Sequence, residues 1–110
     1  NDQFDSEHPA SLSKQTIQDL LRERYEYKGI VITDDLQMKA IQDNYSLKDT
    51  LILAINAGND LLLFGNVDQA DPQLISRIHR IISEAITSGE ISIDRLNESV
   101  NRIIRLKSSL

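Results

Sequence analysis

The stretch Gly29-Ile-Val-Ile-Thr-Asp-Asp-Leu-Gln-Met-Lys-Ala-Ile41 decides how this chain folds. Its consecutive β-branched residues Ile30–Ile32 do not alternate with polar ones, which is typical of a strand buried on both faces in a parallel sheet. We expect that strand to run from Gly29 to Thr33. Asp34 and Asp35 follow at once. Residues just beyond the carboxyl ends of parallel strands line the ligand sites of α/β folds, so these two acids are the first candidates for chemistry.

The composition indicates one small soluble globular domain. The chain has 110 residues, of which 40% are hydrophobic and 26% charged, and no apolar run approaches the length of a transmembrane helix. No signal peptide is visible. There is no cysteine, which excludes disulfides and thiolate chemistry. The net charge of −5 argues against a nucleic-acid partner, which would favour a basic stripe. The late arginines alternate with acids and are interpreted as a solvated helix face: Arg77, Arg80, Arg95, Arg102 and Arg105.

Capping residues and periodicity predict helices around two strands. Ser46 is placed to cap a helix that Gly58 ends in a left-handed conformation. A second buried strand, Leu61–Phe64, follows it. Asp71-Pro72 predicts an N-cap with proline at the first helical position, and Ser92 predicts the start of the last helix. The expected order is therefore α-β-α-α-β-α-α.

A weak repeat accompanies this order, because each strand follows a glycine and ends in a carboxylate or an amide. Successive βα units of a barrel or of a doubly wound sheet produce such a repeat. Two parallel strands alone leave two open edges, and a complete (β/α)8 barrel needs about 250 residues. The chain is therefore either a small unusual α/β domain or a piece of a larger one.

Several segments together resemble family 3 glycoside hydrolases, and most closely the β-N-acetylhexosaminidases that act on bacterial cell-wall sugars. The resemblance covers nearly the whole chain, and its most distinctive part is the Thr-Asp-Asp-Leu-Gln-Met-Lys-Ala-Ile run. The matching segments are His8–Ser13, Leu20–Glu23, Gly29–Ile41, Ala54–Leu63 and Ser88–Lys107.

The resemblance implies that residues 1–110 are the C-terminal portion of a (β/α)8 TIM-type barrel, carrying strands 7 and 8 with their flanking helices. It implies that Asp34 is the nucleophile of a retaining β-N-acetylhexosaminidase that hydrolyses terminal β-linked N-acetylglucosamine, with cell-wall peptidoglycan fragments as the expected source. In that branch the acid/base is a histidine paired with an aspartate on a mobile loop, and no stretch of this sequence matches that loop. The resemblance leaves the compartment open between bacterial cytoplasm and cell envelope.

The other candidate residues have competing interpretations. Asp35 either caps the short helix that follows or orients the loop bearing Asp34, and adjacent residues of an extended chain point opposite ways. Met38 is expected either beneath the sugar site or in the core. His8 and His79 have no second ligand at metal spacing, so we expect neither a metal nor a cofactor.

Other functions remain as alternatives. One is another family 3 glycosidase such as a β-glucosidase, and a second is a non-catalytic α/β interaction module. A phospho-acceptor receiver would need a further acid at the end of the second strand, where this chain has Phe64-Gly65-Asn66. Besides carbohydrate, the expected partner is protein: the rest of the barrel, or a second copy that pairs with the open strand edges. The piece alone is expected to be inactive.

Overall fold

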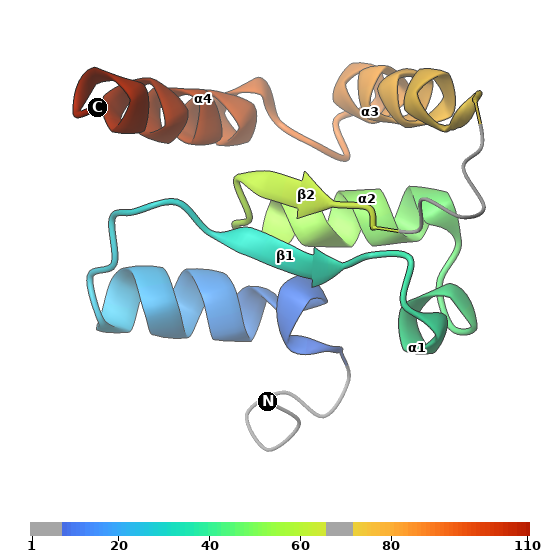
Figure 1. Cartoon of the computed structure of the whole chain (residues 1–110), viewed down its shortest axis with the longest axis horizontal. Coiled ribbons are helices and arrows are strands. Elements are labelled where there is room, and N and C mark those ends of the chain that lie inside the picture. Colours follow the sequence, from blue (N-terminus) through green and yellow to red (C-terminus); the bar gives the residue numbers. More distant parts are fainter. Residues whose placement is uncertain (1–7, 66–71) are drawn as a thin grey trace.

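The computed structural model describes residues 8–65 and 72–110. Two parallel strands lie among helices, as Figure 1 shows, so the predicted α/β class is confirmed. The elements are the 3-10 turn η1 (Ala10–Leu12), the π-helix η2 (Gln15–Arg24), β1 (Ile32–Asp35), α1 (Lys39–Gln42), α2 (Leu47–Ala57), β2 (Leu61–Leu63), α3 (Leu74–Ser88) and α4 (Ile93–Ser108).

The predicted caps of α2 and α4 are confirmed. The Ser46 hydroxyl accepts a hydrogen bond of 3.1 Å from the amide of Asp49, and Ser92 accepts one of 3.0 Å from the amide three residues further on. Each bond satisfies an amide that has no partner within the first helical turn. At the other end of α2, Gly58 has φ 117°, a conformation that L side chains rarely adopt.

The strand bounds differ from the prediction. β1 pairs with β2 from Ile32 opposite Leu61 to Asp35 opposite Leu63, so it begins later than Gly29 and contains both acids. The segment before it is not part of the strand, although the carbonyl of Val31 accepts a hydrogen bond of 3.2 Å from the amide of Leu61, and side chains supply further bonds. The carbonyl of Gly29 accepts from Arg22, and the amide of Val31 donates to Asp60.

The start of α3 also differs from the prediction. The helix begins at Leu74, and Pro72 lies in a turn before it. The first helical hydrogen bond runs from the amide of Arg77 to the carbonyl of Gln73 at 3.0 Å, so the turn that precedes Gln73 is not part of the helix. The predicted cap Asp71 and the strand-end residue Asn66 lie outside the described residues.

The core lies on one side of the sheet, where α2 packs behind the strands (Figure 1). Leu62 of β2 points to this side and joins two buried clusters. The first cluster links η1, the β1–α1 loop, α1 and α2, and the second links α2, α3 and the turn before α4. Their buried members are Leu12, Leu36, Ile41 and Ala54 in the first, and Ile55, Ala85 and Ile91 in the second.

The opposite face of the sheet is open. Ile32 is 58% exposed, and Leu61 and Leu63 of β2 are also exposed. The prediction of strands buried on both faces is therefore wrong for the described chain, because only one layer of helices covers the sheet. This open face carries the candidate site. Among the described residues, no helix is both long and apolar enough to cross a membrane.

Candidate functional site

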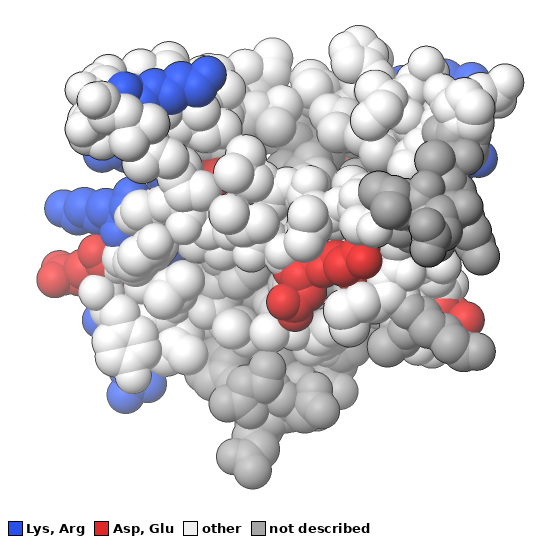
Figure 2. All heavy atoms as spheres, in the orientation of Figure 1, with Lys and Arg blue, Asp and Glu red and all other residues white. Residues whose placement is uncertain are grey.

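Asp34 presents its side chain on the open face near the carboxyl end of β1. It is exposed, whereas its neighbour Thr33 is buried, as the alternation of a strand requires. Within residues 8–65 and 72–110 its carboxylate has no hydrogen-bond or ion-pair partner. Its backbone is fixed, because its amide donates a 2.9 Å hydrogen bond to the hydroxyl of Ser11. Figure 2 shows acidic atoms over the end of β1 on a largely uncharged surface.

Asp35 has a structural role, as one of its two interpretations supposed. Its Oδ1 accepts hydrogen bonds from the amide of Gln37 at 2.9 Å and from the amide of Gly65 at 3.0 Å. The first bond shapes the turn after β1, and the second ties that turn to the end of β2. Gly65 is needed for this approach, because a Cβ there would lie 2.8 Å from Asp35 Oδ2. Asp35 thus orients the loop beside Asp34.

The side chain of Thr33 joins β1 to the end of β2. Its hydroxyl accepts a 2.9 Å hydrogen bond from the amide of Leu63, and the carbonyl of Leu63 accepts from the amide of Leu36 at 2.9 Å. Two contacts therefore hold the end of β2 against the residues that flank the acids. Threonine is a β-branched residue that is common in strands. The hydrogen bond between its hydroxyl and Leu63 could therefore not be predicted from the sequence.

The remaining sequence candidates lie apart from one another. Met38 is exposed beside the strand end, so it is not a core residue, and its contact with a sugar stays a prediction. His8 Nδ1 lies 3.1 Å from the hydroxyl of Tyr45, and His79 is exposed on α3. Across the described parts of the chain, no three His, Cys, Asp or Glu side chains are grouped to hold a metal.

Asp60, at the opposite end of the strands, was missed by sequence reasoning. Its side chain is 0% exposed. Oδ2 accepts from Arg22 at 2.6 Å and from the Val31 amide at 3.0 Å, and Oδ1 accepts from Ser99 at 2.6 Å and from Arg102 at 2.9 Å. Burial by itself raises the pKa of this carboxyl, but the four donors outweigh burial and the pKa is lowered.

Asp60 and its partners Arg22, Ser99 and Arg102 form a polar cluster, which we call the Asp60 cluster. Its charged groups are paired with one another, so we interpret it as structural. It joins η2, the segment before β1, the residue before β2 and α4 at the amino ends of the strands. The interpretation of all late arginines as a solvated face is wrong for Arg102 and Arg95. Arg95 donates to the carbonyls of Ile55 and Asn59 at 2.8 and 2.7 Å, and burial lowers the pKa of its guanidinium.

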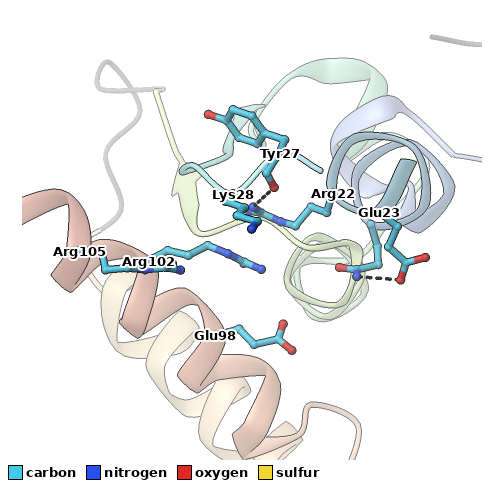
Figure 3. A pocket seen from close by; sticks show the side chains of 8 residues that line it. Arg22, Glu23, Tyr27, Lys28, Glu98, Arg102 and Arg105 are labelled. Carbon is cyan, nitrogen blue, oxygen red and sulfur yellow. Dashed lines mark hydrogen bonds between the residues drawn. The ribbon is translucent and has the colours of Figure 1, made fainter. Parts of the chain in front are cut away.

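A hollow of about 380 Å³ lies beside this cluster (Figure 3). Arg22 extends into it from η2, and Arg102 and Arg105 extend from α4. Arg22 and Arg102 already share the carboxylate of Asp60, and two glutamates also line the walls. The positive charges that line the hollow are therefore largely balanced by acidic side chains of the protein. The candidate functional site remains the end of β1.

Comparison with known proteins gives one consistent family. The profile of the glycosyl hydrolase family 3 N terminal domain matches residues 1–106. Beta-hexosaminidase A of Pseudoalteromonas piscicida is 31% identical over 93% of this chain. A beta-N-acetylglucosaminidase/beta-glucosidase of Cellulomonas fimi is 30% identical over 93% of it. The chain spans only 17% of the length of each of these relatives.

A solved structure agrees with these sequence relatives. The family 3 beta-N-acetylglucosaminidase of Paenibacillus sp. str. FPU-7 superposes with a TM-score of 0.81 at 34% identity. The match covers 93% of this chain and 19% of that one.

Proposed function

This chain belongs to glycosyl hydrolase family 3, and we propose that it is the part of a retaining β-N-acetylhexosaminidase that supplies the nucleophile, Asp34. The observation that carries the proposal is the contrast between the two adjacent acids. Asp35 is occupied by two backbone amides, whereas Asp34 offers a free carboxylate on the open face of the sheet. A nucleophile needs a carboxylate that is ionised, accessible and held on a rigid backbone.

We place residues 1–110 as the last quarter of a (β/α)8 barrel, with β1 and β2 as its strands 7 and 8. The two strands are parallel, and helices cover only the side of the sheet away from Asp34. In a barrel the uncovered side faces the interior and the carboxyl ends of the strands face the substrate. That placement accounts for the exposure of Ile32 and Leu63.

The proposed chemistry begins with attack of an Asp34 carboxylate oxygen on the anomeric carbon. The glycosidic bond breaks, and a general acid protonates the departing oxygen. Water then cleaves the glycosyl ester and releases Asp34. The acid lies about 5–5.5 Å from the nucleophile in the usual two-carboxylate enzymes. Asp35 is turned away toward Gly65, so we assign the acid to a segment outside this chain.

The proposed substrate is a terminal β-linked N-acetylglucosamine, with peptidoglycan fragments as its source. The names of the relatives from Pseudoalteromonas piscicida and Paenibacillus support the sugar. A second candidate is β-glucoside hydrolysis, because the Cellulomonas fimi relative is named for both activities.

Kinetics on the full-length polypeptide test the proposal. We expect Asp34→Ala to abolish hydrolysis of 4-nitrophenyl N-acetyl-β-glucosaminide while the circular dichroism spectrum is unchanged. Asp35→Ala is the matched control at the neighbouring position, and it should lower thermal stability and keep measurable turnover. Wild-type turnover in Asp34→Ala would refute the assignment. Faster turnover of the β-glucoside than of the N-acetylglucosaminide would favour the second candidate.

A further inference from the structure

The carboxylate of Asp34 has no partner of its own among the described residues, so its position depends on its backbone. On the side toward β2, the flanking residues Thr33 and Asp35 accept hydrogen bonds through their side chains from the amides of Leu63 and of Gly65, which lies just after β2. On the other side, the amide of Asp34 donates to the hydroxyl of Ser11, a residue 23 positions earlier in the chain. One hydroxyl therefore fixes the edge of β1 that β2 does not pair with.

The backbone that carries the Ser11 hydroxyl is itself held in place. Ser11 is buried, and its carbonyl accepts a 2.7 Å hydrogen bond from the side-chain amide of Asn59, which is also buried. The second hydrogen of the same Asn59 nitrogen is used by the carbonyl of Ala54 at 2.8 Å. Both hydrogens of the Asn59 Nδ2 are therefore used, which favours this orientation of the amide, although its buried Oδ1 has no hydrogen-bond partner among the described residues.

The support continues into the last helix. The carbonyl of Asn59 accepts from Arg95 Nη2 at 2.7 Å. A continuous set of buried and partly buried hydrogen bonds thus runs from α4 through Asn59 and Ser11 to the amide of Asp34. Rotation of the Asn59 side chain would remove its hydrogen bonds to the carbonyls of Ser11 and Ala54, so these bonds favour the observed arrangement.

We propose that Ser11 is a positioning residue for Asp34, with Asn59 holding the Ser11 hydroxyl in register. The proposal rests on the proposed role of Asp34 as nucleophile. Ser11 touches the backbone of Asp34 and not the sugar, so it acts by fixing the approach of the carboxylate to the anomeric carbon. Misplacing a reacting group by about 1 Å can cost roughly 10²-fold in rate.

The test uses matched variants of the full-length polypeptide. Ser11→Ala removes the acceptor, and Ser11→Thr keeps it. Ser13→Ala is the control, because Ser13 is also buried in the same segment and its hydroxyl accepts from the Thr16 amide at 3.0 Å, away from Asp34. We expect Ser11→Ala to lower kcat by roughly 10- to 100-fold with little change in KM. Ser11→Thr and Ser13→Ala should stay within about threefold of wild type, since neither removes the bond to Asp34.

Hydrogen exchange gives a readout that does not depend on catalysis. The Asp34 amide should exchange faster in Ser11→Ala than in Ser11→Thr or Ser13→Ala. If Ser11→Ala does not fold, Ser11→Cys keeps the side-chain shape and weakens the acceptor, so it should show the same changes to a smaller degree. Unchanged exchange at Asp34, or equal losses of kcat in the alanine and threonine variants, would overturn the positioning role. Full activity of Asp34→Asn would instead overturn the proposed function and leave the exchange result standing.

Discussion

Replacing Asp60 by asparagine should be among the most damaging single changes to the stability of this chain. The carboxylate accepts four hydrogen bonds, two at each oxygen, and it is completely buried. Asparagine places an NH2 group where one oxygen stood, so two of the donors then face another donor. It also removes the charge that compensates Arg22 and Arg102. Breaking a buried ion pair by removing one partner typically costs about 3–5 kcal/mol, and we expect Asp60→Asn to fall in that range.

The pH dependence of this loss follows from the lowered pKa of Asp60. A carboxyl whose pKa is lower in the folded state stabilises the fold fully above its unfolded pKa, which is about 3.9 for aspartate. That stabilisation is lost as the pH falls through the folded value. The difference between wild type and Asp60→Asn should therefore be full at neutral pH and shrink only under strongly acidic conditions.

Urea unfolding of the protein at neutral pH and at pH 3 measures both effects. Asp94→Asn is the matched control, because Asp94 is an exposed acid in the first turn of α4. It should change the free energy of unfolding by no more than about 0.5 kcal/mol. A loss below about 1 kcal/mol for Asp60→Asn would show that the four contacts contribute far less than buried charge-assisted bonds do. An equal loss at both pH values would refute the link to ionisation.

Three further outcomes are expected. Gly65→Ala should push its new Cβ against the Asp35 carboxylate, lower the free energy of unfolding in urea by about 1–3 kcal/mol and lower turnover. Wild-type stability together with wild-type turnover would contradict the close approach. Leu51→Ala, at a fully buried position of α2, should cost about 2–5 kcal/mol in urea unfolding, whereas the exposed Leu110→Ala should be neutral. The isolated 110-residue chain should show no turnover of a chromogenic N-acetylglucosaminide, since general acid help alone is typically worth about 10²–10⁴-fold. Light scattering should show it self-associating through the open strands, and a strictly monomeric folded species would contradict that expectation.

The features predicted from sequence are those whose causes are local. Ser46 and Ser92 cap helices because their hydroxyls reach amides three residues away, and Gly58 ends α2 because its own φ is positive. The position of Asp34 near the carboxyl end of a strand was predictable for a similar reason, since an apolar β-branched run precedes it, although the structure places it within β1 rather than just after it. The strand bounds were less accurate, because side chains bond to the carbonyls of Gly29 and Ile30 and to the amide of Val31.

The features that sequence reasoning missed depend on partners far apart in the chain. In the sequence, Asp60 is a polar residue two positions after Gly58. Its structural role depends on Arg22 and Arg102, which lie 38 and 42 positions away. From sequence alone, Ser11 is one residue of an N-terminal loop. Only the folded structure shows that its hydroxyl lies next to the amide of Asp34. Charge periodicity indicated a solvated face for α4, but Arg95, Ser99 and Arg102 of that helix face the polar cluster around Asn59 and Asp60 instead.

Covalent trapping is the most direct measurement of the proposed role of Asp34. The full-length polypeptide would be incubated with a fluorinated N-acetylglucosaminide that forms the glycosyl ester quickly and releases it slowly, and the labelled peptide would be sequenced by mass spectrometry. The free carboxylate on the open face predicts a single sugar ester on Asp34, absent from Asp34→Ala and present in Asp35→Ala. A sugar found on Asp35, or on any other residue, would contradict it.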